Sequence, residues 1–131
     1  MKHVMYLMLM AAFIGCTKEE SDLARQETTE LTGKWVRVEE YINPGNGGFW
    51  RTANDNPPVV LELTEDGRVV SNHHVYSQFN YFQKVSEDTI SFRGISAPSR
   101  NHSYSLDKGV LTIRYLCIEG CGDRFVKRDQ E

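Results

Sequence analysis

Hydrophobic and polar residues alternate along most of the chain after position 31. The segment "PVVLELT" places Val59, Leu61 and Leu63 on one face, and "VLTIRY" does the same for Leu111 and Ile113. Alternation with a period of two, in segments rich in Val, Ile, Tyr, Phe and Thr, predicts strands with one buried face. An apolar repeat of 3.6 residues, the period of a helix, is not evident after residue 31. We therefore expect an all-β domain.

Turn-forming residues separate these segments at intervals of about ten residues. Glu65-Asp66-Gly67 and Asp107-Lys108-Gly109 are examples, because glycine adopts positive φ without steric cost. Short strands joined by tight hairpins predict an antiparallel up-and-down meander. About eight strands in this order can close into a barrel, which removes exposed edges, or fold over as a β-sandwich. We predict the barrel and keep the sandwich as the alternative.

The first thirty residues follow a different pattern. A basic start is followed by an apolar run from Val4 to Ile14 and then by Gly15-Cys16, which is typical of a secretory signal peptide and too short for a membrane span of about 20 residues. Residues 17–30, "TKEESDLARQETTE", hold five acidic and two basic residues, which predicts a solvated tether. We expect a signal peptide at 1–15, Cys16 with a charged tether at 16–30, and one domain at 31–131.

The cysteine at the end of "FIGC" resembles the lipobox of bacterial lipoproteins. Ile14, Gly15 and Cys16 match that pattern, whereas Phe13 stands where leucine is usual. The resemblance implies a diacylglyceryl group on the Cys16 sulfur, cleavage before Cys16 and acylation by a palmitate-type chain, which together anchor a protein stably. The alternative is an unmodified thiol after an ordinary signal peptide. Lys18-Glu19-Glu20 also resembles export signals of Bacteroidota-type lipoproteins, which implies the outer membrane, with surface exposure favoured over a periplasm-facing anchor.

The domain opens with Gly33-Lys34-Trp35, which resembles the G-x-W motif of lipocalins and lipocalin-like domains. The resemblance implies that the tryptophan closes one end of the barrel and stacks with a basic residue near the last strand. Arg124 is the predicted partner and Arg114 the second choice. With the lipobox and the tether, nearly the whole chain resembles small lipocalin-like lipoproteins of Bacteroidota.

The first strand breaks the simple alternation. Counting from Trp35, Arg37 and Glu39 fall on the tryptophan's face, while Val36 and Val38 fall on the other. We therefore expect either a β-bulge in this strand or an inner face that is partly polar.

Cys117 and Cys121 enclose "IEG" near the end of the chain. A disulfide requires α-carbons within about 7 Å of each other, and Gly120 permits the tight turn that this needs. An oxidised pair is the default outside the cytoplasm. We predict a disulfide; a metal-binding pair and free or redox-active thiols are the alternatives.

Aromatic residues give candidates for a binding site. In "VYSQFNYFQKV", Phe79 and Tyr81 are expected on one face. The longest irregular segment, "NPGNGGFWRTANDNPP", holds Phe49 and Trp50, which would form a lid over a pocket, plug the barrel or begin a strand. The side chains predicted to line the interior are Phe79, Tyr81, Phe92, Tyr104 and Tyr115.

The charge of the chain and its sequence motifs bear on which classes of function are expected. The net charge is −3, and residues 31–131 hold twelve basic and thirteen acidic residues, so no nucleic-acid partner is indicated. No nucleophile motif or placed pair of carboxylates suggests an enzyme, and no cofactor is expected. Adjacent strand residues point to opposite faces, so His73 and His74 are not expected to bind one metal ion together. A metal site would need one of them beside His102 with a carboxylate or thiolate, and we do not expect one.

We therefore expect a membrane-anchored cell-envelope lipoprotein whose barrel binds a small apolar or amphipathic ligand, a use for which barrel mouths are suited. The alternative is a solid barrel that acts as a structural or protein-contacting component and has no small-molecule ligand. The sequence does not indicate which protein partner it would contact.

Overall fold

The computed structural model describes residues 30–118 and 120–128, and its regular structure there is almost entirely β-strand. Only Glu30 and Leu31 have helical backbone. The all-β prediction is confirmed. The strands are β1 (Gly33–Ile42), β2 (Phe49–Thr52), β3 (Val60–Leu63), β4 (Val69–Ser71), β5 (Tyr81–Lys84), β6 (Thr89–Arg93), β7 (Arg100–Asp107), β8 (Val110–Tyr115) and β9 (Cys121–Lys127).

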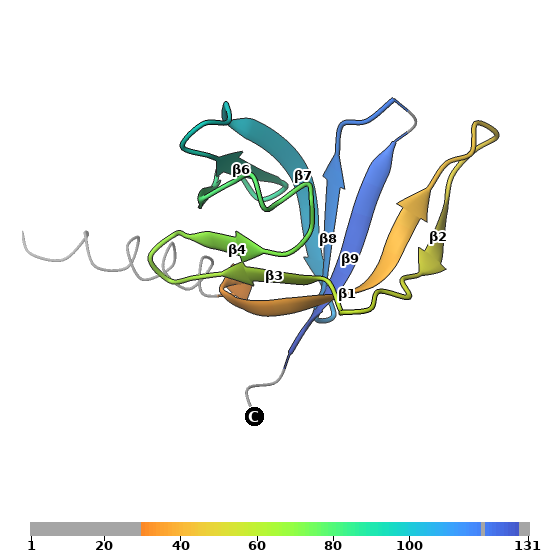
Figure 1. Ribbon diagram of the computed structural model, residues 1–131, viewed down its shortest axis with the longest axis horizontal. Coiled ribbons are helices and arrows are strands. Elements are labelled where there is room, and N and C mark those ends of the chain that lie inside the picture. Colours follow the sequence, from red (N-terminus) through yellow and green to blue (C-terminus); the bar gives the residue numbers. More distant parts are fainter. Residues whose placement is uncertain (1–29, 119, 129–131) are drawn as a thin grey trace, which may run out of the picture.

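All strands belong to one antiparallel sheet with the order β4-β3-β1-β9-β8-β7-β6-β5, and β2 pairs with β1 outside this path (Figure 1). The sheet curls so that its two edges meet. Arg68 forms a β-bridge with Tyr81, and the Val69 N–H donates to the Asn80 carbonyl at 2.9 Å. The result is a nearly closed, lipocalin-like up-and-down barrel of eight strands, as the hairpin pattern predicted, and not a β-sandwich.

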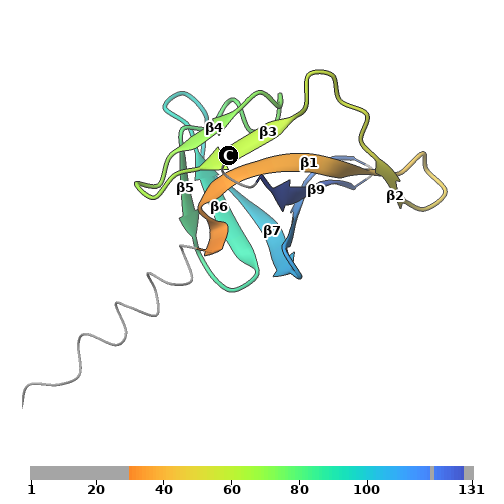
Figure 2. The same ribbon diagram turned by 90° about the horizontal axis from the view of Figure 1, so that it is seen from below.

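Strand β1 connects most of the molecule, because three other strands pair with it. Its first half pairs with β3 and its second half with β2, while β9 follows it along the other side (Figure 2). Its register against β9 shifts between Arg37 and Glu39, which is a β-bulge. The Arg37 side chain points inward and is 10% exposed. Both expectations for this strand therefore hold: it bulges, and its inner face is partly polar.

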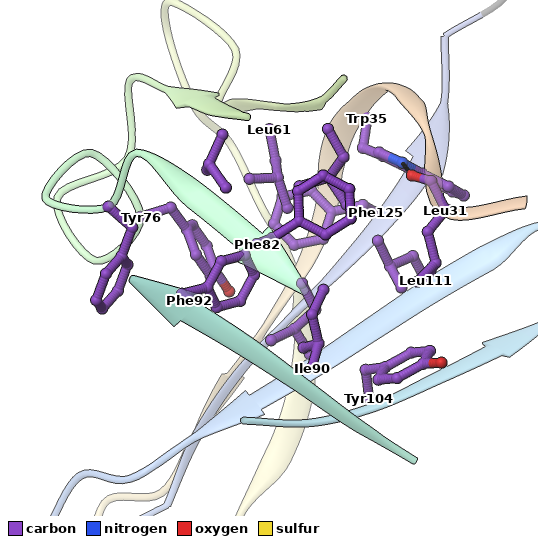
Figure 3. Close-up of a cluster of buried hydrophobic side chains, with 14 residues drawn as sticks. Leu31, Trp35, Leu61, Tyr76, Phe82, Ile90, Phe92, Tyr104, Leu111 and Phe125 are labelled. Atoms are coloured by element: carbon purple, nitrogen blue, oxygen red, sulfur yellow. Dashed lines mark hydrogen bonds between the residues drawn. The ribbon is translucent and has the colours of Figure 1, made fainter. Parts of the chain in front are cut away.

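One end of the barrel is closed by packed side chains. Leu31 and Trp35 lie at one side of the buried cluster and Tyr76 at the other, with Phe92 and Phe125 among the residues between them (Figure 3). The Trp35 indole N–H donates to the Leu31 carbonyl at 2.8 Å. Trp35 thus plugs the end at which β1 begins, β9 ends and the β3–β4 and β7–β8 turns lie.

The cation over Trp35 differs from the one predicted. Phe125 is fully buried, so the period of two along β9 turns Lys127 inward and Arg124 outward. The Lys127 ammonium lies 5.2 Å from the Trp35 ring, whereas Arg124 stacks on Trp50. Gly33 has φ of +136°, and a Cβ there would lie 2.7 Å from Cε of Lys127. A glycine at the first position of the motif thus leaves room for the lysine.

Several sequence predictions lie outside the described residues. They are the signal peptide at 1–15, Cys16, and the tether as far as residue 29. In the part of the chain that the structure describes, no helix has the length and apolar character needed to cross a bilayer.

Candidate functional site at the open end of the barrel

A cavity of about 520 Å³ lies at the end of the barrel opposite Trp35. Its walls come from the turns at 74–78, the beginning of β7, the end of β8 and the disulfide. Aromatic and aliphatic side chains contribute much of the wall, while its cationic and polar groups come from His74, Gln78, Arg100, Asn101 and His102. Among the described residues, no aspartate or glutamate lines it.

The predicted disulfide is confirmed and belongs to this cavity. Cys117 and Cys121 are bonded, with α-carbons 5.8 Å apart, and both line the cavity. The bond closes the turn between β8 and β9, so it fixes one side of the cavity's mouth.

Two of the five predicted lining residues reach the cavity. Phe79 and Tyr115 line it. Phe92 and Tyr104 point inward but belong to the packed core and not to the cavity wall. Burial raises the pKa of the Tyr115 hydroxyl to about 12, so this side chain is neutral at physiological pH.

Tyr81 does not line the interior, which corrects the prediction. It is the first residue of β5, is 38% exposed and stacks with Arg93 on the outside. The neighbouring Phe82 points inward instead. The prediction counted a period of two from Phe79, but residues 74–78 are turns and β5 begins only at Tyr81, so that period does not extend across this segment.

Phe49 and Trp50 begin β2, one of the expected alternatives, and neither lines the cavity. Trp50 lies on the outer face of the sheet, where the Arg124 guanidinium is 4.0 Å from its ring and Tyr41 packs edge-on at 5.3 Å. Gly122 permits this packing, because a Cβ there would lie 3.2 Å from the Trp50 ring. These aromatics hold the β1–β2 hairpin against β9.

A buried ionic network lies inside the barrel, near the cavity. The Arg37 guanidinium donates to Asp123 at 2.9 Å and to both carboxylate oxygens of Asp55, at 2.9 and 2.5 Å. Asp123 is fully buried, and its second oxygen accepts a 2.9 Å hydrogen bond from the Tyr76 hydroxyl. The network therefore joins β1, β9, the β2–β3 connection and the turns at 74–78.

The charges in this network stabilise one another. The hydrogen bonds from Arg37 lower the pKa of Asp55, and the hydrogen bond to Asp55 is the main reason why the pKa of Arg37 is raised. A carboxyl pKa below its unfolded value of about 3.9 contributes stability at neutral pH that is lost as the pH falls through the folded pKa. Arg37 was placed inward by sequence alternation, but Asp123 was missed, although its spacing of two from Phe125 indicates the same face.

Two buried histidines lie close to these groups. His73 Nε2 is 3.1 Å from an Arg37 nitrogen, and since arginine only donates, this ring nitrogen accepts and the imidazole is neutral. Burial lowers the pKa of His73, consistent with that state.

His102 is 6% exposed, and within the described residues neither of its ring nitrogens has a hydrogen-bond partner. It packs against Phe92 at 5.3 Å and against Phe79 and Tyr115 at 6.2 Å between ring centroids. Sequence reasoning considered it only as a metal ligand. Across residues 30–118 and 120–128, no group of three or more His, Cys, Asp or Glu side chains could hold a metal ion.

The site thus combines an apolar aromatic wall with cationic and neutral polar groups. Such a cavity can hold a small molecule that is mainly apolar and has one polar end. Comparison with known proteins adds no family: no protein-family model, curated protein or solved structure matches this chain.

We predict that Asp123→Asn lowers the free energy of unfolding by about 3 kcal/mol, because it removes the fully buried carboxylate that pairs with the Arg37 guanidinium and leaves Asp55 as the main counter-charge. Glu39→Gln is the matched control, since it removes the carboxylate of the ion pair with Arg124 at 3.0 Å, where both side chains are one-third or more exposed. That change should cost at most about 1 kcal/mol. Urea unfolding of the two variants checks this, and equal losses would contradict the importance of the buried network.

Proposed function

We propose that this chain is a lipid-anchored cell-envelope protein whose barrel binds a small apolar or amphipathic ligand at its open end. The observation that carries the proposal is the cavity of about 520 Å³. Small-molecule sites usually have volumes of about 300–1,000 Å³, are mostly apolar and hold a few polar groups, and the mouths of barrels are common places for them.

The arrangement of the two ends supports an anchored binding protein. Trp35 and Leu31 fill the closed end, and the Lys127 ammonium contacts the Glu30 carbonyl there at 3.3 Å. The tether predicted before residue 31 would therefore leave the barrel from the end opposite the cavity. An acylated Cys16 would then place the closed end toward the membrane and leave the cavity open to the surrounding medium.

The alternative is a solid barrel that acts only through protein contacts. Its support is the dense packing of the barrel core, where large side chains such as Phe92, Phe125 and Trp35 are fully or almost fully buried. The cavity at the end opposite Trp35 favours the ligand-binding proposal, because a barrel filled by its own side chains would not leave a hollow end lined by aromatic residues.

We predict that the full-length chain with Cys16→Ser, which has no acyl chain of its own to compete, binds octanol in this cavity. Adding Asn101→Trp should lower the affinity at least about tenfold, because the indole takes up space at the cavity wall. Ser105→Trp is the control, since it adds the same bulk to an exposed position farther along β7. Isothermal titration calorimetry measures both. Octanol binding that is absent, or that is insensitive to Asn101→Trp, would favour the solid barrel.

For the anchor, we predict that Cys16→Ser abolishes incorporation of radioactive palmitate and releases the protein from the membrane fraction, because the acylated sulfur would be lost. Thr17→Ala, the neighbouring substitution, should leave labelling unchanged. Palmitate labelling that persists in the Cys16→Ser variant would refute the anchor and leave the cavity proposal to be judged on ligand binding alone.

A further inference from the structure

The cavity wall contains a polar side chain that lacks a partner. His102 is more than nine-tenths buried, and within the described part of the chain both of its ring nitrogens are without a hydrogen bond. Buried polar groups are nearly always paired, because water is no longer available to them. A ligand in the cavity can supply the missing partner.

The groups around His102 indicate the charge of that partner. Arg100 on its own strand is cationic, and Tyr115 on β8 is neutral. Arg100 is the charged group that acts on His102 electrostatically, and it disfavours the imidazolium. Among residues 30–118 and 120–128, those that line the cavity include no carboxylate. An anionic group beside His102 would therefore meet positive or neutral partners among these residues.

The rest of the wall indicates the ligand's body. Phe79 and Tyr115 pack against the His102 ring, and Leu116 and the disulfide continue the same apolar surface toward the mouth. The polar and apolar parts of the wall are thus adjacent, which suits a molecule that has an acidic group at one end of an apolar body.

We propose that the cavity binds a small amphipathic carboxylic acid, with its carboxylate held by His102 and Arg100 and its apolar body against Phe79 and Tyr115. This inference rests on the proposed function, because it presupposes that the cavity takes a ligand. Both ring nitrogens are shielded from solvent, so this binding requires the imidazole to turn about its Cβ–Cγ bond until one of them faces the cavity.

Binding of the acid should change the protonation state of His102. Burial, and then Arg100, lower the pKa of His102, so the imidazole is neutral at neutral pH. A bound carboxylate favours the imidazolium, so a proton is taken up from solvent when the acid binds. The acid itself stays ionised above about pH 5. Its affinity should therefore rise as the pH is lowered from about 8 to about 6.

The test compares octanoate with octanol, which share the same alkyl chain, on the full-length chain carrying Cys16→Ser. Octanoate should bind about tenfold more tightly than octanol near pH 6, the difference expected from one charge-assisted hydrogen bond. His102→Phe should remove most of the preference for octanoate, together with its pH dependence, and leave only the part that Arg100 supplies. His102→Gln keeps a neutral donor and acceptor, so it should retain part of the preference and lose its pH dependence.

Ser105→Phe is the control, because it places a phenyl ring at an exposed position of the same strand that does not line the cavity, and it should have little effect. If neither compound binds, the proposed function itself fails. If both bind equally, or if the preference for octanoate is undiminished in His102→Phe, the cavity is a binding site but the inference about His102 is overturned. Thermal unfolding of each variant confirms that it is folded before these comparisons are made.

Discussion

The ion pair between Arg37 and Asp123 is the constraint on which the open end of the barrel depends. Two charges in the interior need partners, because an unpaired buried charge is strongly destabilising. The strands of the sheet alone do not provide enough hydrogen-bonding partners for these two charges. Asp55 comes from the β2–β3 connection and the Tyr76 hydroxyl from the turns after β4, so both irregular segments are drawn to the inside of β1 and β9. Those turns carry Phe79, a wall of the cavity. The polar network and the candidate binding site therefore form one structural unit.

Different kinds of interaction hold the two ends of the barrel together. Trp35, Leu31 and their neighbours fill the closed end by apolar packing, with one indole hydrogen bond to the backbone. At the other end the interior is ionic, because Arg37 points inward, and the β-bulge that follows it turns Glu39 outward to pair with Arg124. The cavity lies at this end. The disulfide then fixes the turn between β8 and β9 at its rim.

Local patterns predicted the features that depend on local geometry. Alternation gave the strands, the short spacing of Cys117 and Cys121 gave the disulfide, and the polar residues of β1 gave the bulge. The prediction for Tyr81 required parity across a turn and was wrong. The prediction for Arg124 came from the G-x-W resemblance and was also wrong, because Arg124 lies one position from the inward face. The buried roles of Asp123 and His102 were missed because polar residues are expected at the surface. Their burial depends on partners distant in sequence, and for His102 the sequence offers only its spacing of two from Tyr104.

Backbone amide hydrogen exchange in Tyr76→Phe tests most directly whether the ionic network holds the cavity wall. This change removes only the hydroxyl that donates to Asp123. The amides of Tyr76, Ser77 and Phe79, which bond to carbonyls within their own turns, should exchange about tenfold faster or more, as expected for the loss of a hydrogen bond to a charged group. Amides in β8 and β9 should keep their protection. Unchanged exchange in the 74–80 segment would show that the turns hold their place without the network and would contradict the account.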